Sequence, residues 1–179
     1  EMLDDRPGVY SRPQWTAGGD SLIVAYEDPT RPPDLYRVNV QTKARQPLTF
    51  SNLPALACLE MVTPEAVTYR SFDGLEIPAM RYRPQRSNRA AVVYPHGGPT
   101  GQSGYEWDIL AQYFVAKGYT YLAPNYRGST GYGVAFEQAN YGAWGQGDAQ
   151  DCLAAGRYLH TLEEVDPARI GIFGGSYGG

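Results

Sequence analysis

Hydrophobic and polar positions follow two different patterns along the chain, and the change comes near residue 60. Before it, short segments alternate apolar and polar residues, as half-buried β-strands do, most clearly over residues 34–40. A β-rich run at 22–26 follows turn residues at 17–20, and residues 46–49 predict a further short strand. Residues 28–33 carry three prolines, so we expect a loop there that cannot be helical.

After a linker predicted over residues 53–64, the apolar segments form a hairpin and then buried strands. Residues 66–70 and 77–82 flank Asp73-Gly74, a pair with the usual chemistry of a hairpin turn. A continuous apolar run at residues 90–94 predicts a buried strand of the parallel type. Residues 119–123 and 169–173 predict two further strands.

Two helices are predicted between these buried strands. The first has apolar residues at helical spacing and ends at Gly118; its stripe is Trp107, Leu110, Ala111, Phe114 and Val115. The second begins near Asp148, which together with Asp151 resembles a capping box, and it ends before Pro167. We expect its buried face to contain Cys152, Leu153, Gly156 and Leu159.

The order of strands and helices predicts an α/β fold, with a parallel sheet, right-handed crossovers and helices on both faces. The β-rich segment in front has roughly the content of one β-propeller blade. An isolated β-meander that caps the next domain explains this segment equally well.

Composition and charge exclude several classes of partner. Apolar residues make up 42% of the chain, which is enough for a packed core, and the net charge is −4. No basic stripe is present, so nucleic acid is not an expected partner. No run approaches the roughly 20 apolar residues that cross a bilayer, so we expect no membrane segment. Because the chain begins at Glu1, its native start is expected to lie upstream, and cytoplasm is the default location. The sequence predicts no particular oligomeric state.

Residues 174–178 carry the strongest chemical signal, a Gly-x-Ser-x-Gly turn centred on Ser176. In a nucleophile elbow, the serine stands on a strained turn between a strand and a helix, and the flanking glycines let the two elements approach. The strand predicted over residues 169–173 leads directly into this turn. Ser176 is therefore the predicted nucleophile, and a glycine-rich loop that merely contains a serine is the alternative.

A second glycine-rich segment, His96-Gly97-Gly98-Pro99, directly follows the predicted strand at 90–94. Acyl-transfer enzymes hold the oxyanion of the tetrahedral intermediate with backbone N–H groups, one of which belongs to the residue after the nucleophile. That residue is Tyr177. Since Pro99 has no N–H, Gly98 is the predicted second donor and Gly97 the next candidate; a simple tight turn is the alternative.

Neither histidine is predicted to be the catalytic base. In enzymes with such an elbow, the three catalytic residues follow one another along the chain as serine, acid and histidine. His96 precedes Ser176, so we expect it to hold the oxyanion loop in place instead. His160 lies near a predicted helix end, where a surface or capping role is expected. We therefore expect the acid and the base beyond Gly179, and no turnover by residues 1–179 alone.

Cofactor chemistry finds no support in the sequence. No set of His, Cys, Asp and Glu has metal-ligand spacing, and Gly128, Gly131 and Gly133 do not form the Gly-x-Gly-x-x-Gly pattern of nucleotide sites. No metal and no cofactor are expected. Arg127 is predicted to form a structural ion pair, in a loop on the active-site side of the sheet.

Several motifs follow one another along the chain. They cover residues 33–36, 71–78, 94–99 and 125–133, then Trp144-Gly145 with Asp148 and Asp151, and finally residues 174–179. In this order and spacing, they resemble the prolyl oligopeptidase family of serine peptidases, especially its acylaminoacyl peptidase and dipeptidyl aminopeptidase-like branch. In that family, the dipeptidyl peptidase IV branch has a tyrosine where His96 stands, so the resemblance implies that the backbone of Gly98 supplies the donor here.

The resemblance implies an organisation and an activity. Residues 1–62 would be the end of a β-propeller with a linker, and residues 63–179 an α/β-hydrolase catalytic domain that stops after the nucleophile elbow. The family implies hydrolysis of short peptides through an acyl-enzyme on Ser176. The alternatives are a carboxylesterase of the same fold and a catalytically silent binding module.

Overall fold

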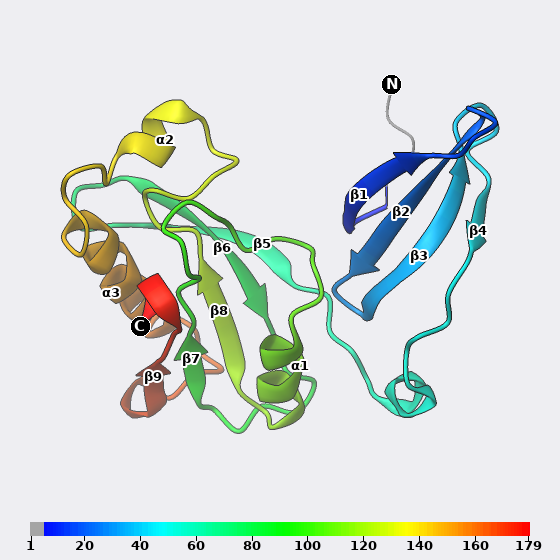
Figure 1. Ribbon diagram of the computed structural model, residues 1–179. Helices are drawn as coiled ribbons and strands as arrows, with labels where there is room; N and C mark the ends of the chain where they lie inside the picture. Colours follow the sequence, from blue (N-terminus) through cyan, green and yellow to red (C-terminus); the bar gives the residue numbers. More distant parts are fainter. Residues whose placement is uncertain (1–5) are drawn as a thin grey trace. The chain divides into compact units, whose positions relative to one another are not determined.

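The computed structural model describes residues 6–179, which divide into two compact units. The first unit contains the residues up to Thr63 together with Tyr105–Ile109. The second contains Pro64–Gly104 and Leu110–Gly179. Figure 1 shows the elements of both units along the chain.

The first unit is built on an antiparallel sheet in which strands adjacent in sequence are also adjacent in space. Over the described residues the sheet has four strands, in the order β1-β2-β3-β4. This confirms the β-rich start that the alternating pattern predicts. The strands are β1 (Val9–Trp15), β2 (Ser21–Asp28), β3 (Arg31–Asn39) and β4 (Arg45–Pro47), and the short 3-10 helix η1 (Pro54–Cys58) follows.

The proline-rich segment is more regular than its sequence predicts. Instead of a loop through residue 33, β3 already begins at Arg31 and includes Pro32 and Pro33. The strand β4 pairs with β3 only over residues 36–38. The prolines therefore stand where the ladder to β4 does not extend, which is where a strand tolerates residues without an N–H.

The second unit contains a mixed sheet rather than the parallel sheet that the sequence predicts. The described strands have the order β5-β6-β8-β7-β9. The strands β8, β7 and β9 are parallel, whereas β6 pairs antiparallel with both β5 and β8 (Figure 1). The predicted hairpin is confirmed, and it introduces the antiparallel part. Their bounds are β5 (Glu65–Arg70), β6 (Glu76–Tyr82), β7 (Ala91–Val93), β8 (Thr120–Pro124) and β9 (Ile170–Ile172).

Helices pack on both faces of this sheet, as predicted. One face belongs to a buried cluster in which Val93 and Leu122 pack with Ala155 and Leu159 of the helix α3 (Gly147–Leu159). On β8 the neighbouring side chain points to the opposite face, because side chains alternate along a strand. There the ring of Tyr121 lies 6.0 Å from that of Phe114 in the helix α1 (Ile109–Ala116). The remaining short helices are α2 (Val134–Gln138), η2 (Pro167–Arg169) and η3 (Ser176–Gly178).

Two predictions about the helices are wrong in detail. The helix α1 begins at Ile109, so Trp107 lies outside it. The predicted buried face of α3 includes Leu153, whose side chain is 54% exposed; the residues that α3 buries are Asp148, Asp151, Ala154, Ala155 and Leu159.

The predicted capping box is also absent. The N-cap residue of α3 is Gln146, whose side chain forms no capping hydrogen bond. The two aspartates accept hydrogen bonds from elsewhere instead, Asp151 from Arg127 and Asp148 from Tyr177. Burial of these carboxylates favours such partners, because a buried charge is costly without them.

Candidate active site

The turn after β9 has the backbone geometry of a nucleophile elbow. Ser176 has a φ of +57°, a left-handed conformation that non-glycine residues seldom adopt. Such a conformation costs about 1–3 kcal/mol and persists only where the surrounding structure holds it. The residue begins the 3-10 turn η3 directly after the strand and its glycines. The strained strand-to-helix turn predicted from the sequence is therefore present.

The flanking glycines are required by close backbone contacts within this turn. A β-carbon at Gly174 would lie 2.0 Å from the carbonyl oxygen of Gly178, far inside van der Waals contact. No side chain fits at Gly174 unless the turn opens. The Gly-x-Ser-x-Gly spacing thus allows the chain to fold back sharply and leave Ser176 at the apex.

The segment after β7 lies directly beside Ser176. A β-carbon at Gly97 would lie 3.4 Å from Cβ of Ser176 and 3.9 Å from its Oγ. Gly98 has a φ of +144°, and a β-carbon there would lie 2.7 Å from the backbone nitrogen of Thr100. The peptide bond between Gly98 and Pro99 is cis. Both predicted oxyanion glycines belong to a tightly turned loop next to Ser176.

Both ring nitrogens of His96 are engaged. Its Nδ1 lies 2.8 Å from the carbonyl oxygen of Gly97, to which only an N–H can donate. Its Nε2 lies 2.8 Å from Oγ of Ser129. Burial lowers the pKa of His96, since it disfavours the charged ring. These contacts make His96 a support of the predicted oxyanion loop, and its burial favours the neutral ring.

Tyr126 completes the support of the loop. Its ring stacks on that of His96 at 4.5 Å, and its hydroxyl donates to the carbonyl oxygen of His96 at 2.7 Å. The ring of Tyr177 lies 6.1 Å from that of Tyr126, at an angle of 27°. Tyr126 therefore contacts both the loop and the residue that follows Ser176.

The sequence predicts no role for Tyr126 or Ser129. Their position in the segment 125–133, directly after β8, is the feature from which their place near the site could have been predicted. Because β8 and β7 are parallel neighbours, the segments that follow them meet at the same edge of the sheet.

Arg127 has the structural role predicted for it. Its guanidinium donates to Asp151 at 2.9 Å from both Nε and Nη2, and to Asp73 at 2.9 and 3.0 Å. Oγ of Ser71 donates to Asp151 as well, at 2.5 Å. These contacts raise the pKa of Arg127, chiefly through the hydrogen bonds to Asp151. The group ties the β5–β6 hairpin to α3.

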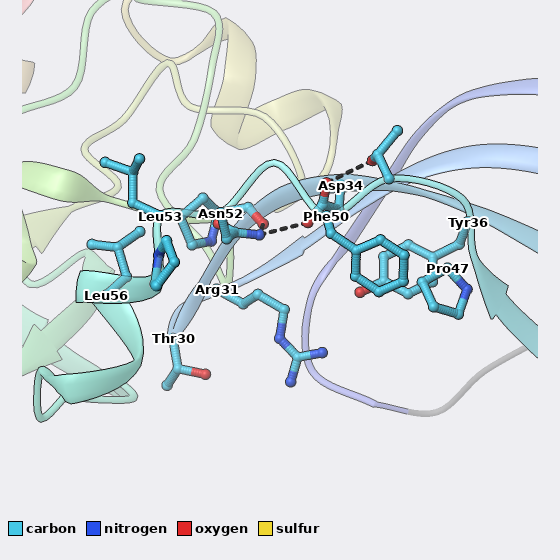
Figure 2. Close-up of a pocket in the computed structure, with 12 residues that line it drawn as sticks. Thr30, Arg31, Asp34, Tyr36, Pro47, Phe50, Asn52, Leu53 and Leu56 are labelled. Carbon is cyan, nitrogen blue, oxygen red and sulfur yellow. Dashed lines mark hydrogen bonds between the residues drawn. The ribbon is translucent and has the colours of Figure 1, made fainter.

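A pocket is present in each unit among the described residues. A pocket of about 460 Å³ lies next to the elbow and is lined by residues that include Asp148, Cys152 and Tyr177. The other, of about 540 Å³, lies in the first unit beside Asp34 (Figure 2). Asp34 accepts from Thr49 at 2.6 Å and from Asn52 at 2.6 Å, so its carboxylate is occupied by the protein itself.

Other functional sites are not evident in the described part of the chain. Among residues 6–179, no group of three or more His, Cys, Asp and Glu side chains could hold a metal ion. In the same range, no helix combines the length and the apolar character that a membrane crossing requires. His160 is exposed and follows the last residue of α3.

Comparison with known proteins places these features in a family. A model of the prolyl oligopeptidase family matches residues 90–179, which include the oxyanion loop and the elbow. The chain is 32% identical over 164 residues to the uncharacterized peptidase YuxL of Bacillus subtilis, covering 88% of this chain and 25% of that protein. It is 27% identical over 178 residues to dipeptidyl-peptidase 5 of Porphyromonas gingivalis, covering 96% of this chain and 26% of the relative.

Solved structures give the same result over nearly the whole chain. A puromycin-hydrolyzing peptidase of Mycobacterium tuberculosis superposes with a TM-score of 0.86 at 28% identity, covering 98% of this chain and 28% of that one. The acylaminoacyl peptidase of Pyrococcus horikoshii superposes with a TM-score of 0.84 at 28% identity, covering 99% and 29%. The chain thus spans about a quarter of the length of these relatives. With the elbow turn at Ser176, the glycine loop beside it and these matches, the chain belongs to the prolyl oligopeptidase family.

Proposed function

We propose that the protein is a serine-type peptidase that cleaves short peptides through an acyl-enzyme on Ser176. The observation that carries this proposal is the strained Ser176, at φ +57°, beside the glycine loop of Gly97 and Gly98. A structural serine has no need of this conformation, whereas a nucleophile must be presented at an apex with donors nearby. The relatives named as peptidases support the same class of reaction.

In the proposed reaction, Oγ of Ser176 attacks the carbonyl carbon of the scissile peptide bond and loses its proton to a base. The oxyanion that forms accepts hydrogen bonds from the N–H of Tyr177 and the N–H of Gly98, with Gly97 as the alternative to Gly98. Each such donor stabilises the transition state by about 3 kcal/mol. The amine then leaves with a proton, and water hydrolyses the ester on Ser176 to release the acid.

The base and its acid partner are proposed to come from outside residues 1–179. The two nitrogens of His96 are held by Gly97 and Ser129, and His160 is exposed at the end of α3. We assign neither histidine as the base, since the chain order serine, acid, histidine also places the base after Ser176. We expect residues 1–179 alone to give no burst with a fluorophosphonate above that of Ser176→Ala.

The four-stranded sheet of the first unit is proposed to be one blade of a β-propeller. The up-and-down order β1-β2-β3-β4 is that of a propeller blade. In this arrangement the substrate would be a short peptide, because the propeller would keep folded proteins from the catalytic domain. No cofactor takes part in the proposed reaction.

The proposal is tested with the full-length protein on acyl-peptide, dipeptidyl and short-acyl ester chromogenic substrates. We expect amide cleavage in the wild type and none with Ser176→Ala, as well as fluorophosphonate labelling that depends on Ser176. Turnover of esters alone would make the protein a carboxylesterase. Complete inertness, with a folded protein, would make it a binding module.

A further inference from the structure

Asp148 is a buried carboxylate in the first turn of α3, close to the elbow. Its side chain is 3% exposed. One carboxylate oxygen, Oδ2, accepts the hydroxyl of Tyr177, the backbone N–H of Gly145 at 3.3 Å and the amide of Asn140 at 3.4 Å. The other oxygen accepts the N–H of Ala149 at 2.9 Å. We call Asn140, Gly145, Asp148 and Tyr177 the Asp148 cluster.

The hydrogen-bond donors in the Asp148 cluster are all neutral groups. Burying a carboxylate is costly, so a position that buries one with neutral partners needs a reason. The start of α3 accounts for one oxygen only, because Oδ1 accepts the N–H of Ala149 in the first turn of the helix. The oxygen Oδ2 instead collects donors around the hydroxyl of Tyr177.

Tyr177 is held on several sides. Besides the bond to Asp148, its ring meets that of Trp144 edge-on at 5.9 Å and lies parallel to that of Tyr126 at 6.1 Å. Burial, followed by the hydrogen bond to Asp148 and the negative charge of that carboxylate, raises the pKa of Tyr177 to about 12. The hydroxyl therefore stays protonated at neutral pH and keeps donating to Asp148.

We propose that Asp148 is a positioning residue for the reaction at Ser176, acting through the hydroxyl of Tyr177. This inference rests on the proposed function, in which the N–H of Tyr177 holds the oxyanion. The side chain of Tyr177 is the first anchor after the strained Ser176, so fixing its far end limits rotation of the peptide between the two residues. Released from Asp148, the elbow relaxes and the N–H turns away from the oxyanion.

Contacts also connect Tyr177 with the loop that carries the second oxyanion donor. Tyr126 stacks on both Tyr177 and His96, and His96 contacts the carbonyl of Gly97. Asp148 therefore lies at one end of a row of aromatic rings that supports both sides of the oxyanion site. The pocket beside the elbow needs no ligand of its own under this inference, since Asp148 and Tyr177 satisfy each other.

The test compares Tyr177→Phe, Asp148→Ala and the double variant in the full-length protein, with a chromogenic peptide substrate. Tyr177→Phe removes only the hydroxyl and is the variant expected to fold normally. Tyr158→Phe is the matched control, because Tyr158 lies on α3, as Asp148 does, and its hydroxyl accepts from Arg81 of β6 at 3.0 Å. Tm, kcat, KM and the rate of fluorophosphonate labelling are measured for each variant.

We expect Tyr177→Phe to lower kcat and the labelling rate about tenfold, as partial loss of one oxyanion donor would, with KM changed less than about twofold. Asp148→Ala should do the same, and the double variant should be no worse than the more affected single variant. Tyr158→Phe should shift Tm about as much as Tyr177→Phe does, and it should leave kcat unchanged.

The inference is overturned if Tyr177→Phe keeps the wild-type kcat, or if Tyr158→Phe loses kcat to the same extent. Independent, multiplicative losses in the double variant would also contradict it, since the two side chains would then act separately. The proposed function has its own test, because Ser176→Ala must abolish turnover whatever these variants do. An active Ser176→Ala protein would refute the proposed function rather than the role of Asp148.

Discussion

Gly178 lies directly against the carbonyl oxygen of Pro95, and a β-carbon at Gly178 would come within 2.2 Å of that oxygen. Pro95 immediately precedes the oxyanion loop, and Gly178 ends the elbow turn. The two segments that form the proposed oxyanion site therefore touch backbone to backbone. A side chain at this contact must push them apart.

Gly178→Ala is expected to reduce kcat/KM by about 100-fold or more, because a displacement of about 1 Å at a reacting centre has that effect. Gly156→Ala is the matched control: Gly156 lies within α3, and a β-carbon there meets nothing within 4 Å. That variant should keep full activity and gain about 0.5–1 kcal/mol, since alanine favours a helix. Turnover and urea denaturation measure both effects. Full activity in Gly178→Ala would mean that the elbow and the loop are not in this contact in solution.

The site could be predicted from sequence to the extent that a local motif encodes it. The turn at Ser176 needs glycines at fixed positions around a serine, and the oxyanion loop needs an exposed run of amides, so both can be recognised in a single stretch. The contacts of Asp148 with Tyr177, 29 positions apart, carry no such pattern. They depend on where α3 packs, and the sequence showed only an aspartate at the start of a helix.

Hydrophobic periodicity predicted the strands and helices correctly where apolar side chains form the buried face. It gave the wrong buried face for α3, where polar side chains are buried. Leu153 fits an apolar helical stripe, yet it is exposed on α3, while Asp151 on the same helix is fully buried. Arg127 makes that burial favourable, and it comes from a different part of the chain. A prediction from hydrophobic periodicity places every aspartate on the surface. The buried face predicted for α3 therefore differs from the face that the structure buries.

Arg127→Met is expected to destabilise the second unit by about 3 kcal/mol or more, because it leaves Asp151 buried without its charged partner. The matched control is Arg83→Met, whose exposed guanidinium lies 3.4 Å from Glu164 and 3.7 Å from Glu65. Exposed pairs of this kind contribute at most about 1 kcal/mol. Urea denaturation of the full-length protein separates the two, and equal losses would contradict the structural role of Arg127.

Asp34 should contribute a pH-dependent part of stability. Burial alone would raise its pKa, but hydrogen bonds from Ser51, Thr49 and Asn52 outweigh burial and lower the pKa to about 2 from its ordinary 3.8. A carboxyl whose folded pKa is lowered adds stability that is fully present above about pH 4 and is lost as the pH falls toward 2. The difference in unfolding free energy between the wild type and Asp34→Asn should therefore be constant near neutral pH and shrink below pH 4. A difference that stays the same down to pH 2.5 would refute this assignment.

His96 should give a second pH dependence, in a higher range. Burial lowers its pKa in the folded protein, so the unfolded chain takes up a proton first as the pH falls. The stability that neutral His96 provides is then fully present above its ordinary pKa of 6.5 and is lost as the pH falls below that value.

His96→Gln keeps a polar side chain in the loop without this titration, and His160→Gln at the exposed end of α3 is the control. The free-energy difference between the wild type and His96→Gln should be constant above about pH 7 and narrow toward pH 5, as measured by urea denaturation across that range. A difference that widens on acidification would mean that the folded loop prefers the charged ring, with Nδ1 donating to Gly97 and Nε2 to Ser129, and that burial does not decide the protonation state of His96.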